Sequence, residues 1–102
     1  MTNINGVEYS VRGTWELKTA KYLNEKGVLW ERLKYLSYVD TEGVKRTYVP
    51  DFYLPSSNEY WEVKGYFSEK DKLKLQLVVE QNRCNLQVLQ ESKLIELGII
   101  AG

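Results

Sequence analysis

Three side chains that could hold a metal ion and stabilise negative charge stand close together in the middle of the chain. Asp51 follows Pro50, and eleven residues later Glu62 begins the triplet Glu62-Val63-Lys64. Two carboxylates and an ammonium group at the ends of successive extended segments can hold a divalent cation beside a phosphodiester and supply a water molecule to attack it. The pattern therefore predicts a metal-dependent nuclease.

The two-residue period of a β-strand predicts how these side chains are oriented. In the segment 59–65, Glu62 and Lys64 project to the same side, because alternate residues of a strand share a face. Antiparallel pairing with the segment 48–54 would bring Asp51 to the edge where Glu62 lies. Like charges there repel unless a cation intervenes, and oxygen ligands with open positions suit Mg²⁺. The alternatives are a solvated strand face for Glu62 and Lys64 and a turn cap for Asp51.

A third acid, Glu16, lies on a predicted helix. Residues 14–26 contain neither Pro nor Gly, and Gly27 follows them as at many helix ends. At about 100° per residue, Glu16 shares a narrow stripe with Ala20 and Leu23. A carboxylate that faces a packed interface needs a partner, so Glu16 is a candidate member of the site. The alternative places a neighbouring apolar side chain inward and leaves Glu16 in solvent.

The remaining pattern predicts one α+β domain of 102 residues, without a repeat or a linker. The expected elements, in the order αβββαβα, are a helix at 14–26, strands at 28–39, 44–54 and 59–65, a helix from 68 to about 82, a strand at 85–90 and a short helix from 92. Asp40 to Gly43 is expected to form the turn between the first two strands. Ser68 with Asp71 three residues later is typical of a helix start.

The ordered set of Glu16, Pro50-Asp51 and Glu62-Val63-Lys64-Gly65 resembles the signature of the PD-(D/E)xK nuclease superfamily. More narrowly, residues 12–90 resemble phage Holliday-junction resolvases of the endonuclease I type and phage homing endonucleases of the same fold. This likeness includes Arg12 four residues before Glu16, and Tyr-x-Pro-Asp-Phe-x-Leu-Pro at 48–55. It departs from the resolvases in lacking their basic C-terminal region. It also departs from the very-short-patch-repair branch, since the chain has no His.

The resemblance implies a restriction-endonuclease-like core, in which a mixed β-sheet is flanked by helices. It implies that Asp51, Glu62 and the carbonyl of Val63 hold Mg²⁺, for which Mn²⁺ can substitute. Glu16 would complete a second metal site or orient a water molecule, and Lys64 would stabilise charge on the phosphorus. The expected enzyme is a DNA endonuclease that hydrolyses phosphodiester bonds with metal-activated water, in a homing or junction-resolving role, and leaves a 5′-phosphate.

The net charge gives no general attraction to DNA, because 14 basic residues balance 14 acidic ones. Metal binding by the three candidate acids would leave 14 basic residues against 11 acidic ones. The candidates for DNA contact are Arg12, Arg32, Lys34, Lys45, Arg46 and Tyr66. Four of the basic residues lie on two segments that the predicted turn would bring together, where they could grip backbone phosphate. A solvated hairpin whose charges aid solubility is the alternative.

The expected partners are DNA and a second copy of the chain, the homodimer being implied by the resemblance. No apolar run is long enough for a membrane span, and the N-terminus lacks the features of a secretory signal. The single cysteine, Cys84, cannot form an internal disulfide. The expected setting is therefore cytoplasmic, for a gene of phage type in a bacterial host. Two other classes stay open: a non-catalytic DNA-binding or assembly domain with a nuclease fold, and the catalytic domain of a longer restriction- or transposase-like protein.

Overall fold

Three helices and five strands follow one another along the chain, which confirms the predicted α+β class. The computed structural model describes all residues from Met1 to Gly102. Its elements are α1 (Thr14–Glu25), β1 (Leu36–Val39), β2 (Lys45–Tyr48), β3 (Phe52–Leu54), β4 (Glu59–Val63), α2 (Glu69–Asn82), β5 (Asn85–Leu89) and α3 (Glu91–Glu96). None of the helices has the length and apolar character that crossing a membrane requires.

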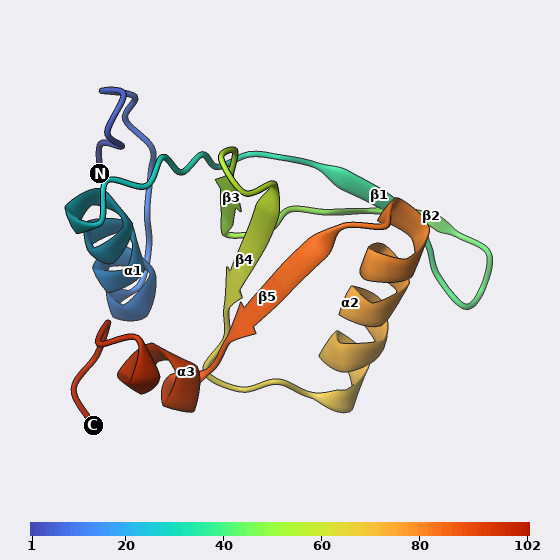
Figure 1. The fold of residues 1–102 in the computed structure, drawn as a ribbon. Coiled ribbons are helices and arrows are strands. Elements are labelled where there is room, and N and C mark those ends of the chain that lie inside the picture. The colour runs from blue at the N-terminus through green and yellow to red at the C-terminus, as the bar shows by residue number, and fades with distance from the viewer.

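The strands form a three-stranded mixed sheet and a separate hairpin. In the order β3-β4-β5, β4 pairs antiparallel with β3 and parallel with β5, whereas β1 and β2 pair only with each other. Figure 1 shows α1 and α2 on opposite sides of the three-stranded sheet, with the hairpin beside α2 and with α3 after β5. The crossover from β4 through α2 to β5 is what allows these two strands to run parallel.

The predicted strands 28–39 and 44–54 are too long. Pro50 cannot donate to a strand ladder, and the chain bends at Asp51, so the second segment divides into β2 and β3. In the first segment, Leu33 has a φ of 63°, a left-handed conformation that no regular strand contains. The backbone of residues 28–35 therefore pairs with the sheet only through one antiparallel bridge, between Glu31 and Tyr53. The observed order is αββββαβα.

Three apolar clusters form the core; one packs α3 against the end of β5, and the other two hold α1 and α2 against the strands. On the α1 side, Ala20 and Leu23 pack with Phe52 and Leu54, as the stripe on the first helix predicts, and Trp30 completes this cluster. On the α2 side, the buried residues are Tyr38, Tyr48, Leu75 and Val78. Leu75 and Val78 form the buried face of α2, whereas Leu73 is exposed. Burial of these apolar side chains is the main force that fixes the framework of the site.

The start of α2 forms as the sequence predicts. The side chain of Ser68 accepts a hydrogen bond from the backbone N–H of Asp71 at 3.1 Å, and the carboxylate of Asp71 accepts one from the backbone N–H of Ser68 at 3.4 Å. This capping box satisfies backbone donors that have no partner in the first turn of a helix. It fixes the position of Asp71 at the end of the loop that follows β4.

Candidate active site

The pairing of β3 with β4 places Asp51 and Glu62 next to each other. Phe52 lies opposite Trp61 in the antiparallel register, so the residue before the first and the residue after the second face each other across the same two strands. The carboxylate of Asp51 accepts a hydrogen bond of 2.7 Å from the backbone N–H of Val63. The two acids predicted for the site therefore lie together at the end of β4.

The carboxyl groups of Asp51 and Glu62 are both largely buried, and burial shifts their pKa values. Burial is the main cause that raises the pKa of Asp51 to about 7, and the negative charge of Glu62 is the next. Burial also raises the pKa of Glu62, against the lowering effect of a hydrogen bond from Tyr48. Two carboxylates in such surroundings are destabilised when both are ionised. A bound cation would remove this repulsion.

Tyr48 fixes the orientation of Glu62. Its hydroxyl donates a buried hydrogen bond of 2.6 Å to Oε1 of Glu62. Burial, and then the negative charge of Glu62, raise the pKa of Tyr48 far above its usual value, so the phenol stays protonated as a donor. With Oε1 occupied, Oε2 is the oxygen of Glu62 that is free for another ligand.

Lys64 lies between the end of β4 and the first turn of α2. Its Nζ is 3.9 Å from Oε2 of Glu62 and 3.8 Å from Oδ2 of Asp71. The side chain is 25% exposed, so the ammonium group is shielded but can still be reached from solvent. The Lys64 side chain therefore reaches the same place as the two carboxylates, which is what the two-residue period predicts.

Glu16 is near the site but has another partner. Its Oε2 lies 3.2 Å from Nη1 of Arg32, whose guanidinium lies 5.6 Å from the ring centre of Phe52. The charge of Glu16 also contributes to the raised pKa of Asp51, so the two acids are within electrostatic reach. No group of three or more His, Cys, Asp or Glu side chains is arranged to hold a metal ion. The site brings together the carboxylates of Asp51 and Glu62, with the backbone N–H of Val63 bonded to Asp51.

Four of the basic residues predicted to contact DNA lie at the two ends of the β1–β2 hairpin. The hairpin pairs Leu36 with Tyr48 at its open end and Val39 with Lys45 at its turn end. Arg32 and Lys34 precede the open end, and both have acidic partners: Arg32 is paired with Glu16, and Lys34 lies 3.5 Å from Glu31.

At the turn end, Lys45 is exposed and Arg46 forms an ion pair of 2.7 Å with Asp40. Arg12 is exposed just before α1, and Tyr66 is 81% exposed in the loop after Lys64. The six candidates do not form a single basic surface.

Three residues at the site, Tyr48, Asp71 and Lys74, are absent from the candidates that the sequence suggested. Tyr48 stands three residues before Asp51, and its inclusion in the Tyr-x-Pro-Asp motif was the available signal. The sequence indicates Asp71 only as part of a helix start. Lys74 is one turn further along α2, 5.4 Å from the ring centre of Tyr48, and its charge lowers the pKa of Glu62. Only the folded chain shows that α2 faces the site.

Comparison with protein-family models, with curated proteins and with solved structures gives no match to this chain. The support for a function is therefore the geometry of the site itself.

Proposed function

We propose that this chain is a Mg²⁺-dependent endodeoxyribonuclease with a restriction-endonuclease-like core. The observation that carries the proposal is the convergence of Asp51, Glu62 and Lys64 at the end of β4, where burial raises the pKa of both carboxyl groups and the charge of Glu62 raises that of Asp51 further. A site built at this energetic cost fits a bound cation and an anionic substrate. Structural ion pairs alone do not require two adjacent acids.

The residues that would hold Mg²⁺ are Asp51, Glu62 and the carbonyl of Val63, with Mn²⁺ as a substitute. Hard oxygen donors with open positions match the preference of this ion. When bound, the ion supplies positive charge that polarises the scissile phosphate and activates water. Glu16 is close enough to act on the site electrostatically. Its proposed role is to orient a water molecule or to help hold a second ion.

The other side chains hold these groups in place. Tyr48 donates to Oε1 of Glu62, and Oε2 is left on the side of Lys64 to bind the ion. The backbone N–H of Val63 fixes Asp51. Asp71 lies 3.8 Å from the ammonium of Lys64, so we assign it the role of a positioning residue. Lys64 then stabilises the negative charge that develops on the phosphate oxygens during hydrolysis.

DNA is the proposed substrate, and a homodimer is the proposed assembly, because cleavage of both strands at one place needs two such sites. We propose a homing or junction-resolving role on the resemblance described above. The basic candidates would then act as separate phosphate contacts on each side of the site and not as one patch.

A cleavage assay tests the proposal. The protein is incubated with Mg²⁺ and with linear duplex, four-way junction and plasmid DNA, beside the variants Asp51→Ala and Lys64→Ala. We expect cleavage by the unaltered protein and a loss of at least about a hundredfold in rate in both variants. Lys72→Ala is the matched control, because this exposed lysine of α2 pairs with Glu69 away from the site. An unaltered protein that cuts none of these substrates in Mg²⁺ or Mn²⁺ would overturn the proposal.

A further inference from the structure

A groove of about 450 Å³ lies between the β1–β2 hairpin and the part of α2 from Lys70 to Leu77. One wall is formed by hairpin residues near the turn, and the other by side chains on one face of the helix. Asp40 and Arg46 line the first wall, Lys70 and Lys74 the second, and Tyr38 and Leu73 supply apolar surface. Of the residues that line the groove, the proposed cleavage chemistry uses only Asp71.

The groove begins at the candidate active site. Asp71 lines the groove, and its carboxylate is 3.8 Å from the ammonium of Lys64. Lys74 lines it too, and its ammonium lies 5.4 Å from the ring centre of Tyr48, which hydrogen bonds to Glu62. A strand with its scissile phosphate beside Lys64 would therefore meet the groove directly.

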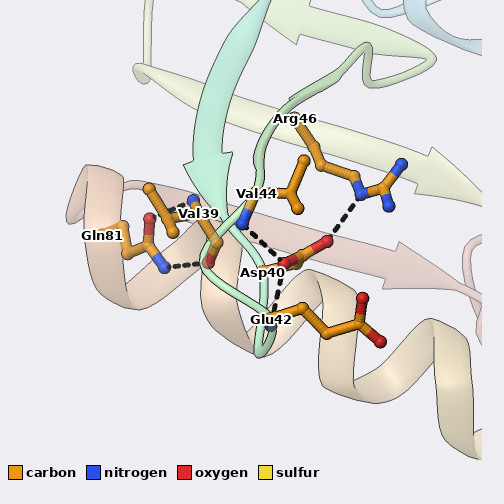
Figure 2. A network of polar contacts seen from close by, with 6 residues as sticks. All are labelled: Val39, Asp40, Glu42, Val44, Arg46 and Gln81. Carbon is orange, nitrogen blue, oxygen red and sulfur yellow. Dashed lines mark hydrogen bonds and ion pairs between the residues drawn. The ribbon is translucent and has the colours of Figure 1, made fainter.

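The hairpin wall is held firmly against α2. The side-chain amide of Gln81 donates to the carbonyl of Val39 at 2.8 Å and accepts from its N–H at 2.7 Å, as Figure 2 shows. The amide of Asn82 donates to the carbonyl of Ser37 at 2.9 Å. These contacts tie β1 to the last turn of the helix, so the groove is formed before any ligand arrives. A preformed groove avoids the entropy cost of ordering its walls on binding.

The carboxylate of Asp40 is bonded to groups within the hairpin itself. Its Oδ2 accepts a hydrogen bond of 2.7 Å from Nε of Arg46, and its Oδ1 accepts from the N–H groups of Glu42 and Val44 at 2.9 and 3.0 Å (Figure 2). The bond from Arg46 is the main cause that lowers the pKa of Asp40. Only Nε of Arg46 is engaged, so its two terminal nitrogens are free to donate to a phosphate.

The helix wall carries free positive charge. Lys70 and Lys74 have no carboxylate within ion-pair distance, whereas Asp71 already lies beside Lys64. Of the acids lining the groove, only Glu42, on the turn, is without a basic partner. The groove is therefore lined by the unpaired ammonium groups of Lys70 and Lys74 and by the terminal nitrogens of Arg46, against one unpaired acid, and this balance favours an anionic ligand.

The size of the groove restricts the ligand to one strand. About 450 Å³ is within the range of pockets that enclose a small molecule, which leaves room for about one or two nucleotides and none for a double helix. Leu73 is 46% exposed and gives a base an apolar surface to lie on. Positive groups along a narrow groove with apolar surface beneath the bases are the general features of single-strand binding.

We propose that this groove binds the unpaired nucleotides that adjoin the scissile phosphate, with phosphates on Lys70, Lys74 and Arg46 and a base on Leu73. The inference rests on the proposed nuclease function and makes its substrate class more specific. The preferred substrate is DNA with an unpaired strand at the point of cleavage, and not a continuous duplex.

Binding of a short fluorescent oligothymidylate, measured by anisotropy without metal at several salt concentrations, tests the groove independently of cleavage. We expect Lys70→Gln to weaken binding by about three- to tenfold and to reduce the salt dependence of log K by about 0.7. Leu73→Ser should weaken binding of the oligothymidylate but not of an abasic oligomer of equal length. Lys72→Gln, the same change on the same helix but outside the groove, should change neither quantity.

Equal effects of the changes at Lys70 and Lys72, or tighter binding of duplex than of single strand, would overturn the groove proposal. Cleavage with Mg²⁺ separates this result from the nuclease proposal. Faster cleavage of a flap or junction than of duplex, slowed by Lys70→Gln, supports both proposals. Groove-dependent binding of the oligothymidylate by a protein that cuts no DNA supports the groove and overturns the nuclease.

Discussion

Asp51→Asn is expected to stabilise the metal-free protein at pH 8 while it abolishes cleavage. The substitution keeps an oxygen that can accept the hydrogen bond from the backbone N–H of Val63. It removes the charge that burial and Glu62 disfavour. Residues that hold a catalytic ion often reduce the stability of the empty protein in this way.

The magnitude follows from the raised pKa of Asp51. In the unfolded chain this carboxyl group has its ordinary pKa of 3.8, whereas in the folded protein the value is about 7. This gap corresponds to about 4 kcal/mol at about 1.36 kcal/mol for each tenfold change in proton affinity. Partial contact with solvent and the interaction with Glu62 make the real effect smaller. We therefore expect Asp51→Asn to raise the free energy of unfolding at pH 8 by about 2 kcal/mol.

The sign of the pH dependence follows from the same values. Between about pH 4 and 7 the folded protein holds a proton on Asp51 that the unfolded chain has released. The contribution of Asp51 to stability is therefore complete below pH 3.8 and lost by about pH 7. The asparagine in Asp51→Asn does not ionise, so the variant does not lose stability in this way as the pH rises. The free energies of unfolding of the variant and the unaltered protein should therefore differ little near pH 4 and most at pH 8.

Urea unfolding of both proteins at pH 4 and pH 8, without metal and then with Mg²⁺, measures these differences. Mg²⁺ should stabilise the unaltered protein more than Asp51→Asn, since a ligand that binds the folded state stabilises it. Asp40→Asn is the control of opposite sign. Its carboxyl group has a lowered pKa, mainly because of Arg46, so its loss should reduce stability at pH 8. A variant at Asp51 that is less stable than the unaltered protein at pH 8, or a difference that is the same at both pH values, would refute the reasoning.

Three other changes test the surroundings of the site. Tyr48→Phe should raise the Mg²⁺ concentration needed for half-maximal cleavage, because the glutamate loses the donor that orients it; rates across a Mg²⁺ series measure this, and an unchanged requirement would contradict it. Asp71→Asn should lower kcat more than KM and slightly reduce the free energy of unfolding, because its charge at the helix start is lost, whereas Glu69→Gln in the same turn should leave kcat unchanged. Leu23→Ala should reduce the free energy of unfolding by about 2–5 kcal/mol, and the same change at the exposed Leu17 by much less; similar losses would show that the core is placed wrongly.

Features that depend on neighbouring residues could be predicted from the sequence. Strand alternation predicted that Glu62 and Lys64 share a face, and the turn at 40–43 and the cap at Ser68 formed where their residues indicated. In each case the determining contacts are only a few residues apart. The break in the strand 44–54 also had a local signal, since Pro50 cannot pair within a ladder.

The buried face of α2 could not be predicted, because its apolar residues do not form one stripe. Leu73, Leu75, Leu77, Val78 and Val79 surround more than half of the helix, so periodicity gives no preferred side. Packing against the hairpin and β5 selects Leu75 and Val78. When Leu75 and Val78 are buried, another face of α2 is left exposed and forms the groove together with the hairpin. The surroundings of the site therefore depend on contacts between residues distant in sequence.

Which basic residues are available to bind DNA also could not be predicted from the sequence. Equal numbers of acids and bases argue against DNA binding only if every base is equally available to phosphate. In the folded protein Arg32 and Lys34 have acidic partners, whereas Lys70 and Lys74 have none and lie beside the candidate site. Pairing within the fold, and not the total charge, decides where a polyanion can bind. A neutral chain can therefore carry a local site for one DNA strand while it has little affinity for duplex elsewhere.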